Sequence, residues 1–135
     1  MTSIAIALRG WNLTCYSNLK GMVCDPGALN SWLGQHEGYV DEDDLDEAAI
    51  GRLNPAKITW PTDGMHTKPD LSLETIKDYI NKERIVIAHV RNRTHFVLAI
   101  GYSETAEEIA VLDSAFNNSF YEFNSILGWR IFDFK

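Results

Sequence analysis

The sequence has few of the features that mark exported, membrane-bound or nucleic-acid-binding chains. Only two of its 135 residues are cysteines, too few for a disulfide framework, so we expect both to remain thiols. No apolar run approaches the roughly 18 residues of a membrane span, and no basic segment precedes the short apolar run near the N-terminus. We therefore expect a cytoplasmic protein with no signal peptide and no membrane span.

Positive charge is also scarce. Twelve lysines and arginines face 19 acidic residues, which leaves a net charge of -7 at pH 7. This sign is wrong for neutralising a phosphate backbone, so we expect no nucleic-acid partner. The oligomeric state stays open.

Metal-binding patterns are missing as well. The four histidines show neither HExxH spacing nor a Cys-x-x-Cys partner. A calcium-binding loop that began at Asp41 would need glycine at its sixth position and glutamate at its twelfth, but these positions are Asp46 and Arg52. We expect no metal and no cofactor.

The composition is that of one folded domain. Apolar residues make up 45% of the chain and aromatic residues 11%, enough for a core of ordinary size. No internal repeat or low-complexity linker interrupts the chain, so residues 1–135 are expected to form a single domain.

Helical patterns fill the first half of the chain. Asp25 and Pro26 form a cap and first-turn proline, which predict a helix over about 26–36. The acidic run over 41–47 precedes apolar residues and predicts a second helix from about Asp43 to Leu53. Ser72 caps a third amphipathic segment that begins at Leu73.

The second half changes to strand patterns. Apolar and β-branched runs predict strands over 84–90, 95–100, 108–113 and about 129–134. Because the run over 96–100 is apolar at every position, both faces of this strand are expected to be covered. Helices followed by an antiparallel sheet indicate an α+β fold.

His95 and Asp113 are polar residues at the ends of two neighbouring strands. A hairpin turn centred on Glu104 places them directly opposite, with Cβ atoms about 5 Å apart, and a shift by one pair leaves them diagonal. A carboxylate beside an imidazole fixes its tautomer, which is the base-and-orienter half of a nucleophilic triad. A structural hydrogen bond at the rim of the sheet is the alternative.

The nucleophile of such a triad would be a thiol at a helix N-terminus. Cys15 suits this role only if its helix begins near Thr14. Otherwise Cys15 is a packed thiol, as we expect for Cys24. His89, in an apolar strand, is expected to be a core histidine with its hydrogen bonds satisfied.

From Gly10 to Phe132 the chain resembles the papain-like cysteine peptidases of the double-glycine leader peptidase (bacteriocin-processing) type. The resemblance is closest to small peptidase-like domains of phage and bacterial cell-wall-associated proteins. It is carried by several blocks in a specific order: residues 25–33, 37–40, 70–73, 85–90, 95–102, 111–114 and 128–132. It implies a papain-like fold, with N-terminal helices packed on a C-terminal antiparallel sheet. It also implies His95 as the catalytic histidine, Asp113 as its orienting carboxylate, and a virion or host-cytoplasm location if the chain is phage-encoded.

The chain departs from the family at the nucleophile. The alignment that we favour matches Leu13, Thr14 and Gly21 without a gap and puts Trp11 where the catalytic cysteine belongs. A competing alignment makes Cys15 the nucleophile. The upstream glutamine that completes the family's oxyanion hole has no counterpart.

Indole cannot attack a carbonyl, so Trp11 at that position predicts a catalytically impaired domain. We expect such a domain to bind a peptide, a cell-wall stem peptide or a protein partner. Two alternatives stay open. One is an active cysteine peptidase or amidase that uses Cys15, His95 and Asp113. The other is a phage structural or host-interaction protein that keeps only the fold.

Overall fold

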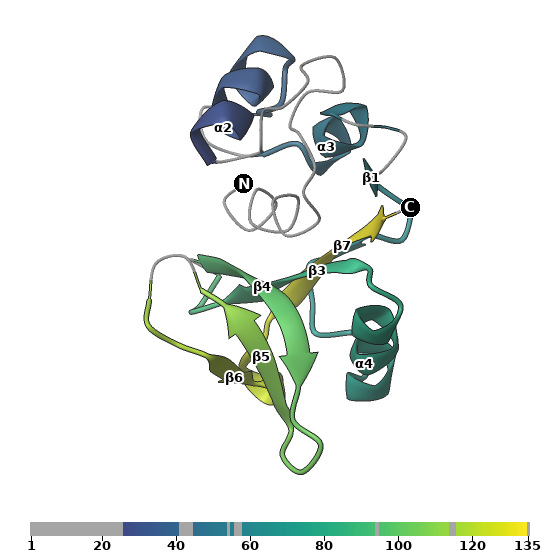
Figure 1. The fold of residues 1–135 in the computed structure, drawn as a ribbon, viewed down its shortest axis with the longest axis vertical. Coiled ribbons are helices and arrows are strands. Elements are labelled where there is room, and N and C mark those ends of the chain that lie inside the picture. Colours follow the sequence, from purple (N-terminus) through teal and green to yellow (C-terminus); the bar gives the residue numbers. More distant parts are fainter. Residues whose placement is uncertain are drawn as a thin grey trace. The chain divides into compact units, whose positions relative to one another are not determined.

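The computed structural model describes residues 26–40, 45–53, 55, 58–93, 95–113 and 116–134. These residues form a mixed α+β fold with an antiparallel sheet of seven strands (Figure 1). The elements in chain order are α2 (Pro26–Gln35), α3 (Glu47–Leu53), β1 (Ile58–Thr59), β2 (Met65–His66), α4 (Leu73–Asn81), β3 (Ile85–Val90), β4 (His95–Tyr102), β5 (Glu108–Leu112), β6 (Phe120–Glu122), the 3-10 helix η1 (Phe123–Ser125) and β7 (Gly128–Phe134).

Two compact units divide these elements. The first holds the described residues up to Trp60 together with Asp133 and Phe134, and the second is the continuous segment Pro61–Phe132. The strand order is β1-β7-β3-β4-β5-β6, with β2 also paired to β7. The α+β class predicted from the sequence is therefore present.

The first unit is built around the apolar side of α2. Leu29 and Leu33 are fully buried and Trp32 is nearly so, as their i, i+3, i+4 spacing predicts. The helix ends at Gln35, one residue before the predicted end. There the amides of His36 and Gly38 both donate to the carbonyl of Leu33.

Helix α3 begins later than predicted. It starts at Glu47 because Asp46 acts as its cap, with Asp46 Oδ1 accepting from the Ala48 amide at 3.1 Å. The preceding Leu45 forms an isolated antiparallel bridge with Tyr39. The expectation of a helix from about Asp43 was therefore wrong, since the end of the acidic run belongs to the cap and bridge. Asp43 itself lies outside the described residues.

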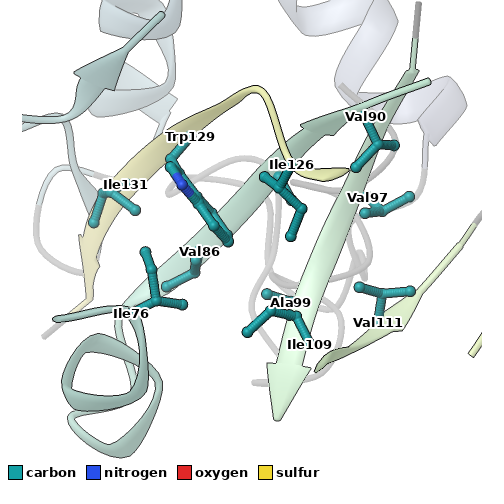
Figure 2. Packing of buried hydrophobic residues seen from close by; sticks show 11 residues of the cluster. Ile76, Val86, Val90, Val97, Ala99, Ile109, Val111, Ile126, Trp129 and Ile131 are labelled. Carbon is teal, nitrogen blue, oxygen red and sulfur yellow. The ribbon is translucent and has the colours of Figure 1, made fainter. Parts of the chain in front are cut away.

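The second unit has its own hydrophobic core, to which α4, β3, β4, β5 and β7 contribute (Figure 2). Ser72 caps α4 as predicted, since its hydroxyl accepts from the Thr75 amide at 3.1 Å. The buried cluster consists of Ile76, Val86, Ala88, Val90, Val97, Ala99, Ile109, Val111, Ile126, Trp129 and Ile131.

Strand β4 is covered unevenly. On one face Val97 and Ala99 belong to the core. On the other face Leu98 is buried, but Phe96 is 36% exposed and Ile100 is 51% exposed. The expectation that both faces are covered was therefore wrong at both ends of this second face.

The hairpin of β4 and β5 fixes the position of the candidate site. Leu98 pairs with Leu112 and Ala99 with Val111, and a β-bulge at Ile100 then shifts the register by one residue. A turn centred on Glu104 would have placed His95 directly opposite Asp113. The observed register is shifted from that one by one residue pair, so the exact pairing predicted from the sequence was wrong. One residue past Leu112, Asp113 comes level with Val97 and diagonal to His95.

Candidate functional site

His95 and Asp113 lie together in the second unit. His95 begins β4, Asp113 follows β5, and Nε2 of the imidazole lies 2.7 Å from Oδ1 of the carboxylate. The histidine side chain is 15% exposed, whereas that of the aspartate is 0% exposed. The predicted proximity of the two residues is confirmed, in the diagonal arrangement that the shifted register allows.

Both oxygens of Asp113 accept further hydrogen bonds. The backbone amide of Phe116 donates to Oδ1 at 3.0 Å, and the hydroxyl of Tyr121 donates to Oδ2 at 2.7 Å. A carboxylate that is shielded from water needs such donors, because a buried charge without them is costly. These contacts hold the carboxylate in one orientation.

The carboxylate in turn sets the tautomer of His95. Because ionised Asp113 only accepts hydrogen bonds, Nε2 of the neutral imidazole carries the hydrogen and Nδ1 carries the lone pair. Nδ1 has no hydrogen-bond partner among the described residues. The lone pair of Nδ1 is therefore directed away from Asp113.

An aromatic ring borders the imidazole, and a guanidinium group lies over that ring. Phe116 meets His95 edge to face, with ring centroids 5.2 Å apart, and is itself 45% exposed. The guanidinium carbon of Arg91 lies 3.6 Å from the centroid of Phe116. The surroundings of His95 thus combine apolar surface with positive charge.

The turn before β4 has an unusual backbone. Arg91, Asn92 and Arg93 have φ angles of 52°, 54° and 67°, in the left-handed region that non-glycine residues seldom occupy. Contacts hold this turn at both ends. Arg91 Nε donates to the hydroxyl of Tyr121 at 3.2 Å, and Arg93 Nη1 donates to the carbonyl of Thr67 at 2.6 Å.

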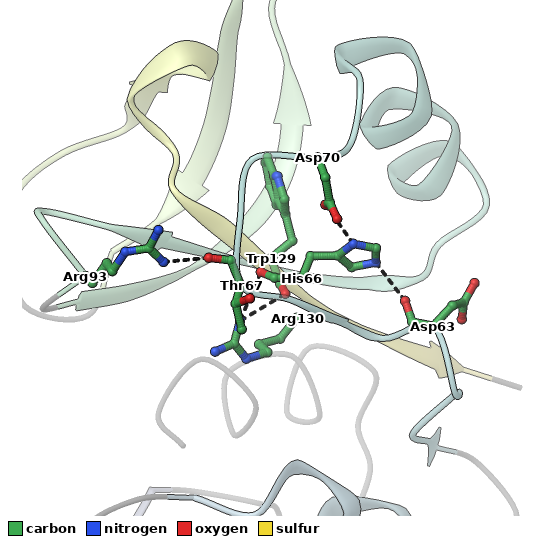
Figure 3. A network of polar contacts seen from close by, with 7 residues as sticks. All are labelled: Asp63, His66, Thr67, Asp70, Arg93, Trp129 and Arg130. Atoms are coloured by element: carbon green, nitrogen blue, oxygen red, sulfur yellow. Dashed lines mark hydrogen bonds and ion pairs between the residues drawn. The ribbon is translucent and has the colours of Figure 1, made fainter.

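A second histidine–aspartate pair involves His66 (Figure 3). Its Nδ1 lies 2.9 Å from Asp70 Oδ1, and its Nε2 lies 2.7 Å from the carbonyl oxygen of Asp63. The carbonyl of His66 accepts from Arg130 Nη1 at 3.3 Å. Since both ring nitrogens are occupied, His66 ties together the loop around β2 and offers no nitrogen for chemistry.

His89 differs from both of these histidines. Its ring stacks on Phe96 with centroids 3.9 Å apart, and its buried Nδ1 has no hydrogen-bond partner in the part of the chain that is described. The expectation that its hydrogen bonds are satisfied was therefore wrong at this atom. Burial lowers the pKa of His89 below 6.5, the charges of Arg130 and Arg93 lower it further, and a hydrogen bond with the backbone of Arg93 opposes them.

Trp11, Cys15 and Cys24 all lie outside the described residues. Among the residues that are described, no group of three or more histidines, cysteines, aspartates and glutamates could hold a metal ion. Within the same residues, no helix is long and apolar enough to cross a membrane.

Sequence reasoning missed three neighbours of the pair: Arg91, Phe116 and Tyr121. Tyr121 lies in a strand of three residues, too short to show a period of two. The contact of Arg91 depends on a left-handed turn, and the sequence of this turn contains no glycine and no asparagine-glycine pair from which it could be predicted.

Comparison of the chain with protein-family models, with curated proteins and with solved structures found no match.

Proposed function

We propose that this chain is a papain-like, cysteine-peptidase-like domain with impaired catalysis, which binds a peptide or protein segment beside His95. The observation that carries the proposal is the oriented imidazole, whose Nε2 is held by Asp113 at 2.7 Å while Nδ1 has no partner among the described residues. A lone pair held in a fixed direction is a good acceptor for a backbone N–H of a bound peptide. Phe116, which is 45% exposed, supplies apolar surface next to it.

Buried carboxylates with a partner add little net stability compared with apolar groups of the same size. The fully buried side chain of Asp113 is therefore better explained by a role for the imidazole that it orients. The impairment is inferred from Trp11, which occupies the nucleophile position in the favoured alignment to the family.

The first test places a thiol at that position. In Trp11→Cys, iodoacetamide at neutral pH is expected to label the introduced thiol at least about tenfold faster than it does in Trp11→Cys/His95→Ala, because a nearby imidazole favours the thiolate. Labelling of Cys15 is expected to be slow and independent of His95. The control is Trp11→Cys/His36→Ala, which removes the exposed imidazole of His36 just past the end of α2. Equal labelling rates of the introduced thiol with and without His95 would refute the alignment.

Binding is tested separately. A displayed library of random peptides is selected on the native protein and counter-selected on His95→Ala. We expect enriched peptides that bind the native protein and lose at least about tenfold in affinity on His95→Ala, the loss of one buried polar contact. A selection that enriches no such peptide would argue against a peptide-binding site at His95.

The second candidate function is an active cysteine peptidase or amidase, and the intact His95–Asp113 pair favours it. Here Cys15 attacks the carbonyl, His95 takes the thiol proton and returns it to the leaving amine, and Asp113 stabilises the imidazolium. This function predicts that Cys15 of the native protein is labelled quickly, and about tenfold more slowly in His95→Ala.

A further inference from the structure

We propose that Tyr121 is the positioning residue of the His95–Asp113 pair, because its hydroxyl holds Oδ2 of Asp113 and thereby turns Oδ1 toward Nε2 of His95. This inference rests on the proposed function for the identity of the site. It holds equally for a site that binds a peptide and for one that hydrolyses it.

The hydroxyl of Tyr121 has a full set of described partners. It donates to Asp113 Oδ2 at 2.7 Å, and it accepts from Arg91 Nε at 3.2 Å and from Asn118 Nδ2 at 3.3 Å. A phenol has one hydrogen and two acceptor lone pairs. Because the guanidinium and amide N–H groups only donate, the single hydroxyl hydrogen must point at Asp113.

The hydroxyl hydrogen of Tyr121 is one of three donors that reach the carboxylate of Asp113 in the described part of the chain. Oδ2 of Asp113 accepts from Tyr121, and Oδ1 accepts from the Phe116 amide at 3.0 Å and from His95 at 2.7 Å. The positive charge of Arg91 next to the hydroxyl polarises it and strengthens the bond to the carboxylate. Donors thus meet at the carboxylate of Asp113 from two sides, from Arg91 through the hydroxyl of Tyr121 and from Nε2 of His95.

Loss of the hydroxyl removes one donor from a carboxylate that water does not reach, since its side chain is 0% exposed. Fewer contacts then fix the rotation of the carboxylate, so Oδ1 is held less firmly toward Nε2 of His95. The imidazole thereby loses part of its fixed orientation.

The variant Tyr121→Phe tests the hydroxyl alone. The ring of Tyr121 packs against the core cluster, and phenylalanine keeps that packing. Tyr102→Phe is the matched control, because Tyr102 also donates a single hydrogen bond, to Asn81 Oδ1 at 3.0 Å, and also packs against the same cluster.

The measurement is NMR of the protein with 15N-labelled histidine at pH 8, which follows the exchange with water of the hydrogen-bonded Nε2–H of His95. In Tyr121→Phe this exchange is expected to be at least about tenfold faster than in the native protein, because one hydrogen bond to a charged group is lost from the network. Tyr102→Phe is expected to match the native protein. A folded Tyr121→Phe that also matches it would overturn the proposal.

A double variant covers the case in which Tyr121→Phe does not fold. Arg91→Met and Asn118→Leu together remove both donors to the hydroxyl at exposed positions and leave the tyrosine in place. The hydroxyl is then no longer held by these two side chains, so the Nε2–H of His95 should again exchange faster than in the native protein, and unchanged exchange would refute the inference. Thiol labelling and peptide selection give separate answers, so failure of the proposed function is recognised independently.

Discussion

Three histidines of the second unit show how neighbouring atoms decide what one residue type can do. In His66 both nitrogens are bound, by Asp70 and by the carbonyl of Asp63, so the ring is a structural tie. In His95 one nitrogen is bound and the other is directed away from its carboxylate. In His89 a buried nitrogen has no partner among the described residues. Of these three rings, that of His95 has one nitrogen held by the carboxylate of Asp113 and no partner for the other nitrogen among the described residues.

His89 predicts a loss of stability in mild acid. Its pKa in the folded protein is lowered below 6.5, chiefly by burial, so between the two pKa values the unfolded chain binds more protons than the folded one. The contribution of His89 to stability is complete above pH 6.5 and is lost as the pH falls through that window. The slope is at most about 1.4 kcal/mol per pH unit.

Urea unfolding from pH 8 to pH 5 measures this effect. His89→Phe keeps an aromatic ring to stack on Phe96 and removes the titrating group, so its free energy of unfolding should fall less steeply with acid than that of the native protein. His36→Phe makes the same change at an exposed histidine of the first unit and serves as the control for the substitution itself. Equal slopes for all three proteins would contradict the assignment.

At the scale of elements, the sequence predicts the helices and strands that are long enough to show a hydrophobic period or that carry a capping residue. Helix α2, the capped helix α4 and the four longer strands were all predicted to within about two residues. The strands β1, β2 and β6 were missed because two or three residues carry no detectable period. The bulge at Ile100 was missed because an isoleucine within an apolar run gives no sign of an extra residue.

The same limits apply to the candidate site. The His95–Asp113 contact was predictable because two polar residues at strand ends stay within reach for either of two registers. The contacts of Tyr121 and Arg91 could not be predicted from the sequence. They depend on strand β6, which was missed, and on a left-handed turn.

The pairing of β2 with β7 gives a prediction at Gly128. A Cβ at this position would lie 2.5 Å from the carbonyl oxygen of His66, a backbone atom that cannot move without disturbing β2. Gly128→Ala is therefore expected to lower the free energy of unfolding by about 2 kcal/mol or more.

Gly34→Ala provides the matched control. It lies in α2, and a Cβ there meets nothing within 4 Å, so the better helix propensity of alanine should raise stability by up to about 1 kcal/mol. Urea denaturation of both variants measures the difference. A Gly128→Ala protein as stable as Gly34→Ala would show that β2 does not approach Gly128 this closely.

At the scale of the whole molecule, the candidate site belongs to one continuous stretch of chain. His95, Asp113, Tyr121 and Arg91 all fall within Pro61–Phe132, the unit that contains the buried cluster around Trp129. The network therefore depends on the stability of this unit's sheet. The network lies near the edge of the sheet that β6 forms, and among the described strands β6 pairs only with β5.

Amide hydrogen exchange across the molecule should follow this gradient. Strand β3 lies between β7 and β4, and its residues Ile85 to Ala88 are all buried, so their amides should open only with the core. Strand β6 pairs with β5 alone, and Phe120 is 51% exposed. We expect exchange in β3 to be at least about a hundredfold slower than in β6, measured by NMR in deuterated buffer. Protection in β6 equal to that in β3 would mean that an additional contact covers this edge, and Tyr121 would then be held by more than the hydrogen bonds of its hydroxyl.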